Sequence, residues 1–432
     1  MGETMTRKRI SWLVAIPVVV LGCGSGSGGK QAAPGGDGGS LADAETTTDG
    51  ATTGDAEAGA PTGDNVAPLI VDDGPPGTAS ADVPFVSVTI CIPGTTTCQT
   101  IDHVSVDTGS SGLRIISSVL KSNIALPQQT ATTGSSLAEC YQYVDGYTWG
   151  SVRLADVKLA GEVAAKIPVH IIGDPAFASV PTDCSSSGSA EDTVVDFGAN
   201  GIIGVNQIVP DCGSYCAAQN PVQTGSYYSC AGGACTAVAV AVANQVSNPI
   251  AFFAKDNNGA VLQFPMVAAA GAPTLAGSMI FGIGTAANNG LGSASVLTVD
   301  ESGNFTTVFN GQTLNTSYID SGTNALSFND AAIPQCTAND TSGFFCPTST
   351  VSLTAQNKGL NGVTSSVSFS VANTDSLFGN ASYTAFDDLG TPYGSSDNTT
   401  FAWGFPFFIG RSVYVAIDGA ATPGGKGPYF AY

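Results

Sequence analysis

Alternating apolar and polar residues run through the chain from about residue 83 onward, and this period of two is the pattern of a β-strand with one buried face. The clearest run is Phe85–Ile90, which is followed, after a Pro-Gly turn, by a second run over residues 99–106. A third pair of runs spans residues 141–161 around an Asp-Gly turn, which predicts a hairpin. The first half of the folded part is therefore expected to be rich in strands.

The second half of the chain repeats this plan. A hairpin is predicted over residues 305–319 around an Asn-Gly turn, and a late strand is predicted over residues 412–418. Stretches that suggest helices are short and are confined to residues 238–246 and 330–333. The pattern as a whole predicts an all-β fold of two similar halves with few short helices.

The first 22 residues have the order of an export signal. Three basic residues precede an apolar run of 12 residues, Ile10–Leu21, which is too short to span a bilayer. The run ends in Val-Leu-Gly-Cys, which resembles the bacterial lipobox. Residues 1–22 are therefore expected to be a lipoprotein signal peptide, and Cys23 is expected to be acylated and to hold the protein on a membrane. Gly24, the residue after this cysteine, favours the outer membrane or the cell surface.

The region after Cys23 does not have the composition of a folded domain. Residues 23–66 consist largely of Gly, Ala, Thr, Ser and Asp and are expected to form a flexible linker. The remaining chain is long enough for two lobes, which we expect over residues 67–265 and 266–432. Because no segment after the signal reaches 18 consecutive apolar residues, this part is expected to be soluble and, by default, monomeric.

The charge balance excludes one class of partner. The chain has 13 Lys and Arg against 34 Asp and Glu, which gives a net charge of −21. An acidic surface of this size repels phosphate backbones and anionic lipid headgroups, so nucleic acid is not an expected partner. The acidity suits an exported, solvated protein.

Eleven cysteines are present, and the ten besides Cys23 are an even set in an exported chain, which predicts disulfides. Spacing favours the pairs Cys91–Cys98, Cys140–Cys184 and Cys336–Cys346. The other four would form two bonds of open connectivity or, less favourably, a zinc site; they are Cys212, Cys216, Cys230 and Cys235.

Each half contains a strand that ends in an acidic turn. The two turns are Asp107-Thr108-Gly109-Ser110 and Asp320-Ser321-Gly322-Thr323. Two carboxyl groups held close together cannot both ionise, so one stays protonated while the other can accept a proton from water. The glycines permit a tight turn, and the hydroxyl side chains can hold the carboxylates in place. An apolar pair followed by glycine comes later in each half, at residues 202–204 and 402–404, and this repetition predicts a paired site.

These segments resemble the active-site segments of the pepsin-like aspartic peptidases and, beyond them, those of an uncharacterised bacterial family of exported pepsin homologues. The similarity covers residues 82–432 and is clearest at residues 104–113, 197–204, 318–323 and 403–418. It implies a bilobal, pepsin-like double β-barrel with a cleft between the lobes. It also implies an endopeptidase that acts on peptide or protein substrates with Asp107 and Asp320 as its catalytic pair, without a metal or other cofactor.

The resemblance further implies a hairpin flap over the cleft, and Tyr143 matches the tyrosine that covers the substrate. Two positions depart from the family pattern. Arg114 stands where an aromatic residue is usual, and Asn324 stands where Ser or Thr is usual. These departures keep two alternatives open: an inactive pepsin fold that binds peptides or proteins, and a structural scaffold at the cell surface.

Overall fold

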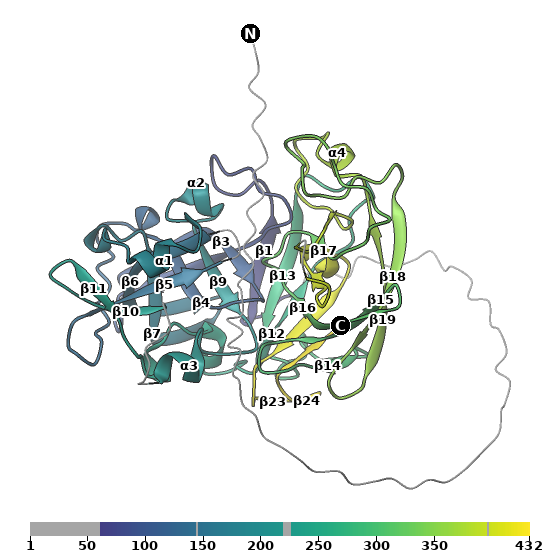
Figure 1. Cartoon of the computed structure of the whole chain (residues 1–432). Helices are drawn as coiled ribbons and strands as arrows, with labels where there is room; N and C mark the ends of the chain where they lie inside the picture. Colours follow the sequence, from purple (N-terminus) through teal and green to yellow (C-terminus); the bar gives the residue numbers. More distant parts are fainter. Residues whose placement is uncertain (1–60, 144–145, 219–225, 395–396) are drawn as a thin grey trace, which may run out of the picture. The chain divides into compact units, whose positions relative to one another are not determined.

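A computed structural model describes residues 61–143, 146–218, 226–394 and 397–432 (Figure 1). Within these ranges most of the regular structure is strand, in one 16-stranded sheet and one seven-stranded sheet. The 16-stranded sheet follows the order β11 (Ala234–Ala237), β10 (Tyr227–Ala231), β5 (Ser136–Gln142), β6 (Gly146–Leu159), β7 (Glu162–Ile172), β4 (Ser111–Ile116), β9 (Gly201–Val205), β3 (Cys98–Asp107), β2 (Pro84–Cys91), β1 (Val66–Val71), β13 (Leu275–Phe281), β12 (Gly259–Gln263), β22 (Ser412–Ala416), β25 (Tyr429–Ala431) and β14 (Val296–Thr298), with β8 (Ser189–Ala190) beside β6.

The seven-stranded sheet belongs to the second half of the chain. Its order is β19 (Thr364–Val371), β18 (Val351–Lys358), β15 (Phe305–Phe309), β16 (Gln312–Ile319), β21 (Ala402–Trp403), β17 (Leu326–Ser327) and β20 (Gly390–Thr391). A separate short pair is formed by β23 (Ala421–Thr422) and β24 (Gly425–Lys426). We call β2–β11 the first lobe and β13–β25 the second lobe.

Helices in the described residues are short. They are α1 (Thr182–Ser185), α2 (Val194–Phe197), α3 (Gly213–Ala217), α4 (Thr374–Leu377) and the 3-10 turns η1 (Ser117–Val119), η2 (Pro175–Phe177), η3 (Val242–Asn244), η4 (Pro249–Phe252) and η5 (Phe405–Phe408). The prediction of helices at 238–246 and 330–333 was wrong, because the first is reduced to η3 and the second is a turn. The N–H of Val240 bonds to the carbonyl of Cys216, so this alternating Ala-Val stretch is held by a neighbouring segment rather than by its own helix.

The two lobes repeat one strand arrangement around their acidic turns. In the first lobe β3 ends at Asp107, runs parallel to β9, and is followed by β4, which is antiparallel to β9 and parallel to β7. In the second lobe β16 ends next to Asp320 and runs parallel to β21, and β17 is antiparallel to β21 and parallel to β20. The internal repeat predicted from sequence is thus a repeat of four strands, and the all-β fold of two similar halves is confirmed.

Local sequence explains the hairpins that lead into these turns. Asn310 and Gly311 both have positive φ, at 48° and 74°, which is the backbone of the tight turn that Asn-Gly favours. The β15–β16 hairpin therefore forms where it was predicted. The Cys91–Cys98 disulfide spans β2 and β3 in the same manner, since these two residues are cross-strand partners.

Strand β1 joins the two lobes. It pairs with β2 of the first lobe on one edge and along its whole length with β13 on the other edge, as Figure 1 shows. One hydrophobic core cluster contains Val106 and Ile203 from the first lobe and Ile319 and Trp403 from the second. Residues 61–432 accordingly form one compact unit.

Five disulfides are formed, and all ten predicted cysteines take part. The three predicted pairs are present, and the remaining four cysteines pair as Cys212–Cys216 and Cys230–Cys235. The alternative of a zinc site was wrong, because these sulfurs are bonded to one another. Asp375 lies near Cys336 and Cys346, but that disulfide leaves no thiolate to bind an ion. Five disulfides are typical of an exported protein.

The expected signal peptide, Cys23 and most of the expected linker lie outside the described residues. Among the described residues, no helix has both the length and the apolar character needed to cross a membrane.

Candidate active site

Each acidic turn holds its own carboxylate with the same pair of bonds. In the first lobe the N–H of Gly109 donates to Oδ1 of Asp107 at 2.7 Å, and the hydroxyl of Ser110 donates to Oδ2 at 2.5 Å. The second lobe repeats this with the N–H of Gly322 at 2.8 Å and the hydroxyl of Thr323 at 2.7 Å, both to Asp320. Both carboxylates are thereby fixed in orientation by a backbone donor and a hydroxyl donor.

Reciprocal hydrogen bonds connect the two turns. The N–H of Thr108 donates to Oγ of Ser321 at 3.2 Å, and the N–H of Ser321 donates to Oγ1 of Thr108 at 2.9 Å. The two hydroxyls then donate onward across the lobes, that of Ser321 to the carbonyl of Val106 at 2.7 Å and that of Thr108 to the carbonyl of Ile319 at 3.3 Å. All of these groups are buried, so the bonds are shielded from exchange with water.

This connection brings Asp107 and Asp320 into contact, and neither residue has exposed surface. A Cβ atom placed on Gly109 would lie 2.7 Å from Cγ of Asp320, so only glycine fits against the carboxyl group of the other lobe. Burial, the charge of Asp107 and a side-chain hydrogen bond with Asp107 raise the pKa of Asp320 well above its ordinary value of 3.8. Asp320 therefore keeps its proton at pH values above 3.8.

The β5–β6 hairpin reaches this pair, but Tyr143 does not face outward. Only 1% of its surface is exposed, and its ring packs against that of Phe197 with centroids 5.9 Å apart. Within the described residues its hydroxyl has no hydrogen-bond partner. Burial raises its pKa well above 10, and the nearby charge of Asp107 adds to this. Tyr143 is thus placed as a core residue of the first lobe.

Tyr141, two positions earlier, is the tyrosine of β5 that keeps a partly exposed surface. Its ring centroid lies 5.0 Å from that of Tyr143. Burial of the hydroxyl and the charge of Asp107 raise its pKa above the usual value of 10, while Arg114 opposes this shift. Of the two tyrosines, Tyr141 is therefore the one that keeps exposed surface.

The two departures from the family pattern are both buried. The side-chain amide of Asn324 donates to the carbonyl of Ala81 at 3.3 Å. The next residue, Asp82, accepts a hydrogen bond from the N–H of Phe386 in the second lobe. Arg114 lies in β4 with no exposed surface and forms ion pairs with Glu139 and Asp211. Arg114 could be identified from the sequence as a departure from the family pattern, but its partners Glu139 and Asp211 could not. An isolated cation within the apolar run Leu-Arg-Ile-Ile is the signal that could have prompted a search for a buried acid.

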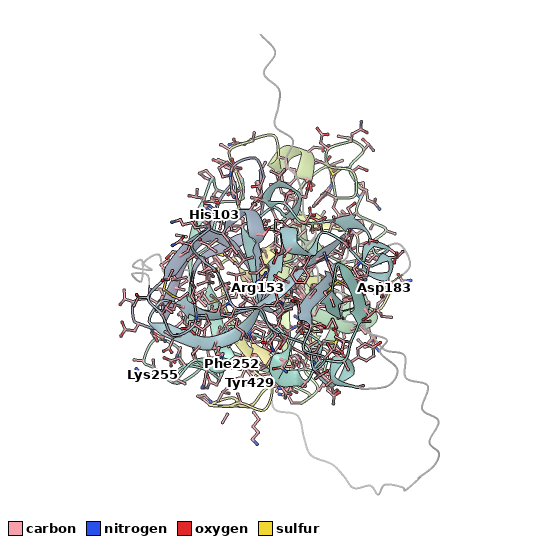
Figure 2. The ribbon with its side chains drawn as sticks, turned by 90° about the vertical axis from the view of Figure 1, so that its left-hand side faces the viewer. His103, Arg153, Asp183, Phe252, Lys255 and Tyr429 are labelled. Atoms are coloured by element: carbon pink, nitrogen blue, oxygen red, sulfur yellow. A yellow bond between two sulfur atoms is a disulfide. The ribbon has the colours of Figure 1, made fainter. Side chains whose placement is uncertain are left out.

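The two histidines do not serve the acidic pair as bases. His103 (Figure 2) is partly exposed, and its Nε2 lies 3.2 Å from the carboxylate of Asp72. His170 is fully buried, and its Nδ1 lies 3.0 Å from Oε2 of Glu139. Burial lowers the pKa of His170, which keeps the ring neutral near pH 7.

Comparisons with known proteins give a family and a similar structure. Residues 61–432 match a family model described as a protein of unknown function, DUF3443. No curated protein matches the chain. Among solved structures, the crystal structure of aspartic proteinase from Irpex lacteus is 14% identical and aligns over 85% of this chain and 96% of that chain, with a TM-score of 0.47.

Proposed function

The chain belongs to the DUF3443 family of proteins of unknown function, and we propose that it is an aspartic endopeptidase that hydrolyses peptide bonds with Asp107 and Asp320. One observation carries the proposal. Two buried carboxyl groups, one from each lobe, touch each other and are each held by a backbone N–H and a hydroxyl. Such a pair combines an acid and a base within reach of one water molecule and one carbonyl group.

The reaction follows from the shared proton. The ionised carboxylate takes a proton from a water molecule as the water oxygen attacks the carbonyl carbon of the peptide bond. The protonated carboxyl, which the raised pKa assigns to Asp320, gives its proton to the carbonyl oxygen. The tetrahedral intermediate collapses when the carboxyl that took a proton from water gives it to the amide nitrogen and a hydroxyl of the intermediate returns a proton to Asp320. The C–N bond breaks, the carboxylic acid and the amine leave, and the pair again holds one proton. Because each carboxyl group is already held in place by its turn, the site needs little rearrangement to reach the transition state.

The location belongs to the same proposal. Export is supported by the five disulfides. We infer that acylation of Cys23 attaches the protein to the outer face of a bacterial cell envelope, with residues 23–60 as a spacer that lets the site reach peptide or protein substrates. Mass spectrometry of the N-terminal peptide of the mature protein tests this, since an unmodified Cys23 or an intact signal would contradict it.

Turnover is the decisive measurement. The purified full-length protein is incubated with a peptide library between pH 3 and pH 8, beside the variants Asp107→Asn and Asp320→Asn, which keep the size of the side chains. The exposed Asp192→Asn serves as a control for the substitution itself. We expect cleavage by the wild type and the control and a loss of at least about 1,000-fold in both site variants.

A different result would point elsewhere. If the folded wild type cleaves no peptide at any pH and retains peptide binding in both site variants, the protein is a binding protein with a pepsin-like fold. If it neither cleaves nor binds peptides, the reading as a surface scaffold replaces the proposal.

A further inference from the structure

Arg114 is a buried cation at the centre of the first lobe, on the strand that follows the Asp107 turn. Its Nη1 donates to the carbonyl of Ser111 at 2.8 Å. Its Nη2 donates to Oε1 of Glu139 at 2.7 Å and to Oδ2 of Asp211 at 2.9 Å. The guanidinium carbon lies 3.6 Å from the ring centroid of Tyr141, which is close for a cation over an aromatic face.

These contacts join segments that are distant in sequence. Ser111 is the first residue of β4 and directly follows the acidic turn, Glu139 and Tyr141 belong to β5 of the hairpin, and Asp211 follows β9. The hydroxyl of Tyr227 in β10 donates to Asp211 at 2.8 Å. Arg114 is therefore the point at which the catalytic turn, the hairpin and the segment after β9 meet.

Arg114 lies between two buried carboxyl groups. Burial would raise the pKa of Glu139, but the charge of Arg114 holds it below the ordinary value of 4.5. Burial and the charge of Glu139 raise the pKa of Asp211, while Arg114 and the hydroxyl of Tyr227 oppose this shift. Removal of Arg114 would leave Glu139 buried without its cation, and removal of Glu139 would take from Arg114 the nearer of its two carboxyl partners.

The hairpin that Arg114 contacts is held on both edges. Strand β5 pairs with β10 on one outer edge of the hairpin, and strand β6 pairs with β7 on the other. Strand β10 in turn pairs with β11 and is closed by the Cys230–Cys235 disulfide. A hairpin with both neighbours in place, and with a buried ion pair at its base, does not have to be ordered by a ligand.

We propose that Arg114 is a positioning residue, which through Ser111, Glu139 and Tyr141 fixes the β5–β6 hairpin beside Asp107, so that a peptide meets a preformed wall instead of a lid that closes over it. The proposal rests on the proposed function for its effect on turnover, but the order of the hairpin is a property of the protein itself. Arg114 acts through Tyr141 and does not touch the reacting atoms.

Three variants of the full-length protein separate the parts of this arrangement. Tyr141→Leu removes the aromatic face and leaves the ion pairs intact, whereas Tyr141→Phe keeps the face. Arg114→Lys keeps the charge but loses the planar fork that reaches three oxygens at once. Tyr383→Leu, a partly exposed tyrosine of the second half, is the matched control. The readouts are kcat and KM on one cleaved peptide and hydrogen exchange of the amides of residues 136–142.

We expect Tyr141→Leu and Arg114→Lys to raise KM about tenfold while kcat stays within about threefold, because a looser hairpin must be ordered at binding. Exchange in 136–142 should become at least about tenfold faster in both variants. Tyr383→Leu should resemble the wild type in both readouts, and Tyr141→Phe should keep the wild-type exchange because the aromatic face remains.

Unchanged exchange in the folded Tyr141→Leu variant would overturn the proposal, as would a tenfold fall in kcat with unchanged KM. If Arg114→Lys does not fold, Tyr141→Leu decides alone. If the wild type shows no turnover, the proposed function fails, and the exchange data still decide whether Arg114 holds the hairpin.

Discussion

The N–H of Thr108 donates to the hydroxyl oxygen of Ser321 at 3.2 Å, and the N–H of Ser321 donates to the hydroxyl oxygen of Thr108 at 2.9 Å. Each lobe thus supplies a hydrogen-bond acceptor to the turn of the other. The acidic pair depends on this exchange, because no covalent bond between the two turns keeps the carboxyl groups together. The relationship predicts how the pair responds to change.

The first prediction concerns Ser321. Ser321→Ala leaves the buried N–H of Thr108 without its acceptor and the carbonyl of Val106 without its donor. We expect the free energy of unfolding to fall by about 1–3 kcal/mol and kcat to fall about tenfold or more. Urea unfolding and steady-state kinetics measure the two effects. Ser321→Thr, which copies the residue found at the related position of the first lobe, should keep most of both.

The second prediction concerns the space between the carboxyl groups. Gly109→Ala places a methyl group 2.7 Å from Cγ of Asp320, which must then move. We expect kcat/KM to fall about 100-fold or more, because a misplacement of about 1 Å is enough for such a loss. Gly290→Ala, where a Cβ meets no atom within 4 Å, is the control and should be active. A fully active Gly109→Ala enzyme would contradict the close approach of residue 109 to the carboxyl group of Asp320.

The third prediction concerns pH. The proposed acid is the protonated form of Asp320, whose pKa is raised above 3.8 by burial and by Asp107. Activity should therefore persist well above pH 3.8 and be lost as pH rises through the raised pKa, and the stability that comes from the protonated group should be lost over the same range. A pH profile of kcat/KM with an uncharged peptide tests this. Activity that increases steadily up to pH 8 would contradict the assignment of the proton.

The fourth prediction concerns a buried carboxyl outside the site. Burial and then the charge of Asp387 raise the pKa of Asp388 to about 7. The protonated group is favoured by folding, so its contribution is complete below pH 3.8 and is lost as pH rises to about 7. Asp388→Asn should raise the free energy of unfolding by about 1–3 kcal/mol at pH 8 and by little at pH 4. Ser376→Ala, on nearby α4, should show no such pH dependence. An equal effect of Asp388→Asn at both pH values would argue against ionisation as the cause.

The acidic turns could be predicted from sequence because their information is local. A strand, an Asp, a Gly and a hydroxyl residue are all contained in a few consecutive positions, and their repetition indicated the pairing. The turn at Asn310 and Gly311 was predictable for the same reason, since two adjacent residues supply its backbone conformation.

The environment of Arg114 could not be predicted in this way. Its partners Glu139 and Asp211 come from separate strands and loops, and a short sequence pattern carries no information on which acid will face a given cation. The burial of Tyr143 could not be predicted from the alternating pattern of the strand for a related reason. Tyr141 and Tyr143 are two positions apart and so share one face of an alternating strand. The packing of Phe197 from a distant segment decides which ring is covered.

Strand β1 has a consequence for the anchoring that we infer. Residues 61–65 connect the spacer to β1, and β1 supplies hydrogen bonds to β2 on one edge and to β13 on the other. Mechanical tension on a surface-attached molecule would therefore be transmitted first to the strand that joins its lobes. Shear that detached β1 would uncover both of these edges and part the first lobe from β13, so the same attachment that localises the protein would make the connection between its lobes sensitive to force.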